Sequence, residues 1–152
     1  MEKIHFETTI HAPVEKVWDM LISDATYREW TAEFNPSGSW YEGSWEKGSK
    51  IKFFGPNSIT GIPGGMTCEI AEYRPYEFIS IKNLGLISDG VEIFSGPSVD
   101  AWIPGYENYT FTRIDENTTK LDIEMDTANE SKEIFSELWP KALEKLKSMC
   151  ER

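Results

Sequence analysis

Cysteine and histidine are scarce in this chain, and their scarcity removes several classes of protein. Only two cysteines occur in 152 residues, Cys68 and Cys150, and both lie in apolar segments. Their number and spacing do not support a disulfide framework, so we predict two buried free thiols. The two histidines, His5 and His11, share the strand parity opposite to the apolar residues around them. Both are therefore expected to face solvent, which argues against a serine–histidine–aspartate triad.

Positive charge and long apolar runs are also in short supply. Fifteen basic residues stand against 26 acidic ones, which gives a net charge of −11. Such a surface repels phosphate backbones and anionic membranes, so we expect neither a nucleic acid nor a membrane as partner. No apolar stretch reaches the roughly 20 residues of a membrane-spanning helix, and Met1-Glu2-Lys3 leads into a strand pattern instead of a signal-peptide core. These features predict a cytoplasmic protein.

Large aromatic side chains, by contrast, are abundant. The chain has six tryptophans, six tyrosines and eight phenylalanines. They provide ample apolar surface, of which a part can line a cavity instead of filling a core. The length predicts one domain that spans residues 1–152.

The most regular pattern lies at the end of the chain, from Thr127 to Arg152. Charged side chains occupy one helical face, and the opposite face is a stripe of nine apolar residues at helical spacing: Ile134, Phe135, Leu138, Trp139, Ala142, Leu143, Leu146, Met149 and Cys150. Thr127 and Glu130 match a capping box, which favours one continuous helix with a bend at Pro140. In the alternative interpretation, the helix begins near Pro140 and Glu130–Leu138 forms a separate turn.

The earlier part of the chain is mostly β. Two short helices are predicted after the first strand. The first has Pro13 at its first position and an apolar stripe from Val14 to Ile22, and the second covers Asp24–Ala32. Alternating apolar and polar residues, separated by turn signals, predict seven strands: Ile4–Ile10, Ser39–Trp45, Ser49–Phe54, Met66–Tyr73, Phe78–Leu84, Tyr106–Ile114 and Thr118–Asp126. Consecutive antiparallel strands on short turns followed by one long helix indicate an α+β fold.

Two segments are too long for ordinary hairpin turns. Gly55–Gly65 is rich in glycine and proline, and Gly85–Gly105 carries several large apolar residues. Loops of this length in a compact domain are usually functional or disordered, and the apolar content of the second argues against disorder. We expect Gly85–Gly105 to form a lid or to pack on the sheet edge, with a short helical turn at Pro97. A dimer contact is the alternative.

The order of these elements resembles a known superfamily. Four segments carry the resemblance: Ala12–Trp18, Trp45–Phe53, Ile70–Pro75 and Trp139–Leu146. With the strand–two helices–strands–helix order, the chain resembles the START/polyketide-cyclase/birch-allergen superfamily. Within it, the chain is most similar to the branch of activators of the ninety-kilodalton heat-shock chaperone's ATPase.

The resemblance implies a helix-grip fold. In that fold a seven-stranded curved antiparallel sheet wraps around the long C-terminal helix and leaves a cavity between them, often used for apolar or amphipathic ligands. The superfamily has no universal catalytic residues, so the resemblance assigns none here.

Two sets of histidine and acidic residues could be interpreted as a metal site or an acid–base site. His5, Glu7 and His11 share one strand parity, and Asp122 and Glu124 alternate with apolar neighbours on another strand, with Asp126 continuing the series. Both sets fall on the polar side of their strands. We therefore interpret them as solvated sheet surface and predict no metal site.

The inward-facing residues are better candidates for a site. If the faces that carry Asn83, Glu107 and Arg113 are concave, these residues supply polar groups to the cavity wall. The alternative is that Glu107 and Arg113 lie at strand ends in contact with solvent. A few polar groups in an aromatic pocket are typical of small-molecule sites. We predict no catalytic residue, no cofactor, and this ligand-binding set: Trp30, Phe34, Met66, Ile81, Asn83, Glu107, Tyr109, Phe111, Phe135, Leu138 and Trp139.

The sequence therefore favours a non-catalytic protein that binds a small apolar or amphipathic ligand between its sheet and its C-terminal helix. A protein-interaction module, which the resemblance to chaperone activators implies, is the alternative, with a protein partner for the acidic surface. A cyclase-type enzyme that uses Glu107 as its acid–base group ranks third. The sequence leaves a monomer and a homodimer equally open.

Overall fold

The computed structural model of the chain describes residues 1–56 and 63–152. It contains eight strands, four helices and two 3-10 turns in these residues. In chain order the elements are β1 (Glu2–Ile10), α1 (Val14–Ile22), α2 (Asp24–Trp30), η1 (Thr31–Glu33), β2 (Trp40–Gly43), β3 (Lys50–Pro56), β4 (Pro63–Arg74), β5 (Phe78–Ser88), β6 (Val91–Ile93), α3 (Pro97–Asp100), β7 (Gly105–Asp115), β8 (Thr118–Thr127), η2 (Asn129–Ser131) and α4 (Lys132–Cys150).

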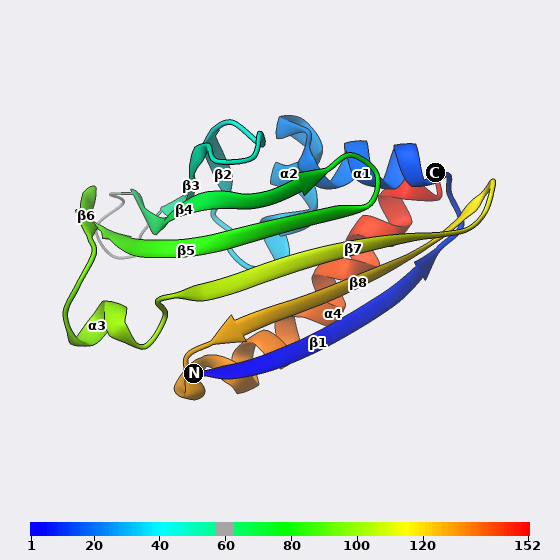
Figure 1. The fold of residues 1–152 in the computed structure, drawn as a ribbon. Helices are drawn as coiled ribbons and strands as arrows, with labels where there is room; N and C mark the ends of the chain where they lie inside the picture. The colour runs from blue at the N-terminus through cyan, green and yellow to red at the C-terminus, as the bar shows by residue number, and fades with distance from the viewer. Residues whose placement is uncertain (57–62) are drawn as a thin grey trace.

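All eight strands belong to one antiparallel sheet. Seven strands follow the order β1-β8-β7-β5-β4-β3-β2, and β6 pairs with the end of β5. The seven predicted strands are therefore present, and the difference from the prediction is the short strand β6. Figure 1 shows the sheet curving over α4, which crosses the strands on one face. The predicted α+β helix-grip architecture is confirmed.

The two short helices carry the chain from one edge of the sheet to the other. Because β1 and β2 occupy opposite edges, the connection between them has to cross the sheet. The helices α1 and α2 make this crossing (Figure 1). On α1, Val14, Val17, Trp18 and Leu21 are buried, as their helical spacing predicts. The concave face thus receives α1 and α2 as well as α4.

The long helix α4 is continuous through Pro140. It begins at Lys132 and not at Thr127, because Thr127 is the last residue of β8 and its hydroxyl donates to the carbonyl of Ala128 at 3.2 Å. The predicted capping box is therefore wrong. Burial along the helix is uneven: the apolar stripe is buried from Trp139 onward, whereas Ile134 is 56 % exposed. The first half is thus left free to border a cavity.

Both segments predicted as long loops contain strand residues. The ends of the predicted loop Gly55–Gly65 pair as β3 and β4, and residues 57–62 lie outside the described part of the chain. The segment Gly85–Gly105 folds back as β6 on the end of β5 and then forms the short helix α3 from Pro97 to Asp100. The predicted helical turn at Pro97 is confirmed. The segment also packs on the sheet, but beside the interior strand β5 and not at an outer edge, and its first residues, Gly85–Ser88, belong to β5.

The outer face of the sheet carries the charged residues that alternate with the core. Along β8, Leu121, Ile123 and Met125 are buried, and the intervening carboxylates point outward. Basic side chains meet these carboxylates: Lys3 lies 3.2 Å from Glu124. Half-exposed ion pairs of this kind contribute little stability, so the apolar side of the strand dominates its packing. Cys68 and Cys150 are buried and free, as predicted.

Candidate functional site

A cavity of about 460 Å³ lies between the concave face of the sheet, α2 and the first half of α4. Its volume falls within the range of small-molecule sites. Eleven of the 23 described lining residues are aromatic: Tyr27, Trp30, Phe34, Trp45, Phe53, Phe54, Trp102, Tyr106, Tyr109, Phe135 and Trp139. The others are Leu21, Thr31, Ser39, Gly65, Met66, Ile81, Asn83, Leu86, Gly105, Glu107, Met125 and Asp126.

The cavity occupies one end of the concave face because α1 fills the other end. Phe111 lies at that filled end, where its ring centroid is 5.0 Å from that of Trp18. Tyr73 also meets Trp18, at 5.4 Å. No helix plugs the sheet in the same way beside Tyr109, within the part of the chain that the structure describes. The space there is enclosed instead by side chains from α2, α4 and the strands.

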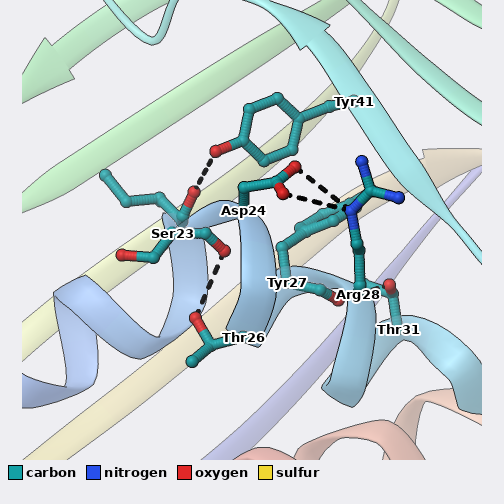
Figure 2. A network of polar contacts seen from close by, with 8 residues as sticks. Ser23, Asp24, Thr26, Tyr27, Arg28, Thr31 and Tyr41 are labelled. Atoms are coloured by element: carbon teal, nitrogen blue, oxygen red, sulfur yellow. Dashed lines mark hydrogen bonds and ion pairs between the residues drawn. The ribbon is translucent and has the colours of Figure 1, made fainter.

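The wall formed by α2 is held by side-chain hydrogen bonds and an ion pair, which Figure 2 draws. The hydroxyl of Tyr41 donates to the carbonyl of Ile22 at 2.6 Å, which ties β2 to the end of α1. Thr26 bonds the carbonyl of Ser23 at 3.2 Å, and Arg28 pairs with Asp24 one helical turn away. These contacts fix a helix of only seven residues, which would not be stable alone.

Trp30 is the anchor of the same wall. It is 2 % exposed, and its indole N–H donates to the carbonyl of Leu21 at 3.0 Å. Its ring lies 6.1 Å from that of Trp139 on α4. Phe34 then meets Trp139 edge-on at 4.8 Å. Helices α2 and α4 are thus joined through aromatic rings, and the cavity lies beside this junction.

The connection between β5 and β7 supplies a further aromatic residue. Trp102, which follows α3, lines the cavity and meets Phe135 of α4 edge-on at 6.0 Å. Phe135 in turn lies 6.4 Å from Phe34. The segment that was predicted as a lid or edge element therefore reaches across to the helix and borders the cavity.

Glu107 is the principal charged group of the interior wall. Strand register places it between Ile81 of β5 and Met125 of β8, and all three residues line the cavity. Surrounding atoms withdraw its carboxyl from bulk water, and this desolvation raises its pKa from 4.5 to about 7. The hydroxyl of Tyr109 hydrogen-bonds to the carboxylate and partly opposes the shift. The prediction that Glu107 belongs to the cavity wall is thus confirmed.

Asn83 is the second polar group, and its hydrogen bonds are internal. Its side-chain amide donates to the sulfur of Met66 at 3.4 Å, and its side-chain oxygen accepts from the backbone N–H of Gly85 at 3.2 Å. Asn83 pairs with Cys68 and Gly85 pairs with Thr67, so Leu84 is an extra residue that makes a β-bulge. Asn83 therefore holds the bulge and shapes the wall.

Nine of the eleven predicted ligand-binding residues line the cavity. The exceptions are Phe111, which packs against Trp18, and Leu138, which is half-buried on α4. Leu138 precedes Trp139 by one residue, and one residue rotates a helix by about 100°, so both side chains cannot face the same space. Arg113 also lies outside, exposed and paired with Glu15 at 2.6 Å. Ligand contact by the nine remains a prediction.

Other lining residues escaped the sequence analysis for identifiable reasons. Phe53 shares strand parity with buried Ile51, so alternation was a sufficient signal. Simple alternation from Asn83 would turn Leu86 away from the cavity. The bulge at Leu84 adds one residue and turns the Leu86 side chain toward the cavity. Tyr27 and Trp102 lie on a short helix and in a connection, where no periodicity indicates which way a side chain points.

On the outer face of the sheet, the His5–Glu7 pair from the sequence analysis lies beside Asp122. His5 bonds Asp122 at 3.1 Å, and Glu7 completes a group of three with these residues. His11 is not part of it. Lys120 lies 3.3 Å from Glu7 and 3.8 Å from Asp122, so a cation of the protein already offsets part of the charge of the cluster.

Solved structures share the fold at low sequence identity. A protein from Mesorhizobium loti has 17 % identity and a TM-score of 0.70, with 97 % of this chain and 95 % of that chain covered. A protein from Chromobacterium violaceum has 16 % identity and a TM-score of 0.68, over 100 % and 99 % of the two chains. The Aha1 dimer from Colwellia psychrerythraea has 17 % identity and a TM-score of 0.68, over 99 % and 97 %.

A family model identifies the family of the chain. No curated protein matches the sequence. Among the described residues, no helix has the length and apolar content needed to cross a membrane. The family model described as "Activator of Hsp90 ATPase homolog 1-like protein" matches residues 11–151, almost the whole chain. Together with the helix-grip fold, this match shows that the chain belongs to the family of activator of Hsp90 ATPase homolog 1-like proteins.

Proposed function

We propose that this protein binds a small apolar or amphipathic molecule in the cavity between its sheet and α4, without covalent chemistry. The observation that carries the proposal is the cavity of about 460 Å³ with its largely aromatic lining. A void of this size with such walls forgoes packing energy in the empty protein, and a ligand that fills it recovers dispersion and burial. Asn83 and Glu107 supply the few polar groups that orient a ligand.

Native mass spectrometry of the purified protein tests for a resident ligand. We expect a stoichiometric small molecule that organic extraction removes and that restores thermal stability when it is added back. A bound ligand stabilises the folded state by mass action, so the melting temperature rises with its concentration.

Substitution of Leu86 by tryptophan tests the location of the site. Leu86 lines the cavity and is half-buried, so a larger side chain has room to enter the space. We expect the affinity for N-phenyl-naphthylamine, a neutral apolar fluorophore, to fall about tenfold or more, because the indole excludes the probe. Leu84→Trp is the matched control, since Leu84 is half-buried in the same strand but does not line the cavity. Equal affinities in the two variants would contradict the proposal.

A protein-interaction module is the second candidate function, and the family match favours it. The acidic outer face of the sheet is the surface suited to a basic partner, because its negative charge attracts a positively charged surface and speeds the encounter. The test is stimulation of the purified ninety-kilodalton chaperone's ATPase by this protein at low and at high salt. Stimulation that falls with salt supports this function, and no stimulation at low salt rejects it.

A further inference from the structure

The cavity wall carries negative charge and no positive charge among its described residues. Two carboxylate residues, Glu107 and Asp126, line the cavity, and no lysine, arginine or histidine does so. Residues 57–62, which the structure does not describe, contain no basic residue in the sequence. The electrostatic character of the site is therefore set by its carboxylates.

The two carboxylates differ in how far the protein itself neutralises them. Asp126 lies 3.1 Å from the ammonium group of Lys3 and accepts the backbone N–H of Tyr106 at 2.9 Å. Glu107 has no ion-pair partner among the described residues, and its protein contact is the neutral hydroxyl of Tyr109. Glu107 is thus the carboxylate left to meet a charge supplied from outside.

Aromatic rings surround the space that Glu107 borders. Tyr27, Trp30 and Trp139 line the same cavity, and the rings of Tyr109 and Trp139 lie 6.2 Å apart. The face of an aromatic ring carries negative electrostatic potential and attracts cations, most strongly for tryptophan. Rings and carboxylate therefore favour the same sign of ligand charge.

We propose that the cavity selects a lipophilic organic cation, an amine whose ammonium group pairs with Glu107 while its hydrocarbon part packs on the aromatic wall. This inference rests on the proposed function above and specifies its ligand class. A carboxylic acid of the same size is disfavoured, since its charge would be buried beside Glu107 with no cation to compensate it. Neutral molecules fall between the two.

The selection for a cation depends on the protonation of Glu107. The titratable groups that face it are Tyr109 of its own strand, Tyr27 of α2 and Cys68 of β4, and burial raises the pKa of all three, so they remain neutral. Its register partners, Ile81 of β5 and Met125 of β8, do not titrate. The other charged group of the wall is Asp126 of β8, which is paired with Lys3. Because burial raises the pKa of Glu107 to about 7, cation binding is expected to strengthen as pH rises from about 5 to about 8.

Calorimetric titration with octylamine, octanol and octanoate tests the selection, since the three probes share one hydrocarbon chain. At about pH 8 we expect the amine to bind roughly tenfold more tightly than the alcohol and octanoate to bind most weakly. In Glu107→Gln the preference for octylamine over octanol should be lost, because the substitution removes the carboxylate that pairs with the ammonium group. Glu116→Gln is the matched control, because it removes the same charge from an exposed turn.

The outcomes distinguish cation selection from ligand binding in the cavity as such. Suppose that octanol binds and that Leu86→Trp abolishes its binding, but that the amine is not preferred and Glu107→Gln has no effect. This result overturns the cation selection and leaves the cavity as the binding site. An equal loss of amine binding in Glu116→Gln would attribute the preference to net charge and also overturn the inference. Failure of all three probes to bind overturns both proposals.

Discussion

Glu107→Gln is expected to increase the free energy of unfolding at about pH 8 by about 3 kcal/mol, while leaving it almost unchanged at about pH 4. The folded protein holds the Glu107 proton up to a pKa of about 7, whereas the ordinary value is 4.5. Unfolding therefore releases a proton between these values, and the wild-type protein loses stability as pH rises through this window. Above about pH 7 the loss is complete, because the carboxyl is ionised in both states.

Glutamine avoids this loss because it is neutral at every pH. Its side-chain oxygen can still accept the Tyr109 hydroxyl, so the substitution removes the charge and keeps that hydrogen bond. Urea unfolding at several pH values measures the difference between the two proteins. Glu116→Gln, in an exposed turn, should show no such pH-dependent gain. A Glu107→Gln effect of equal size at low and high pH would show that Glu107 does not titrate as inferred.

Trp139→Ala is expected to destabilise the protein by about 3–5 kcal/mol, the usual cost of deleting a buried tryptophan. Trp139 is 2 % exposed and contacts the rings of Phe6, Trp30, Phe34 and Tyr109. Its indole N–H also lies 2.9 Å from the sulfur of Met125. The side chain therefore connects α4 to α2 and to the sheet, and its loss would merge an additional void with the existing cavity.

Thermal unfolding followed by circular dichroism measures this loss, which corresponds to a fall in melting temperature of roughly 10 °C. Trp40→Ala provides the comparison, because Trp40 is half-buried on the edge strand β2 and stacks on the ring of Phe54. A smaller loss is expected there. Similar losses in both variants would mean that Trp139 does not join the layers as described.

Sequence periodicity predicted the parts of the fold in which one face is buried and the other is solvated. The alternation along β8 and the stripe that begins at Trp139 are examples, because burial there follows strand or helix spacing directly. The short strand β6 has three residues, too few for alternation to be visible. The capping-box match at Thr127 failed because pairing with Glu2 of β1 extends β8 to that residue.

The composition of the cavity wall was predictable, and its boundaries were not. Strand parity identified Ile81, Glu107 and Tyr109, because each strand turns these side chains to the concave face. It could not show that α1 fills the end of that face beside Phe111. The bulge at Leu84 concealed Leu86, since a bulge depends on pairing with a distant strand and not on local pattern.

The position of β1 also has a consequence for how the chain folds during synthesis. β1 pairs with β8, and the register joins Glu2 to Thr127, so the partner of β1 is synthesised only after β2 to β7. Closing so long a loop is slow compared with forming the β4–β5 hairpin, whose strands are neighbours in the chain. The nascent chain therefore carries β1 without its partner strand while β2 to β7 are synthesised.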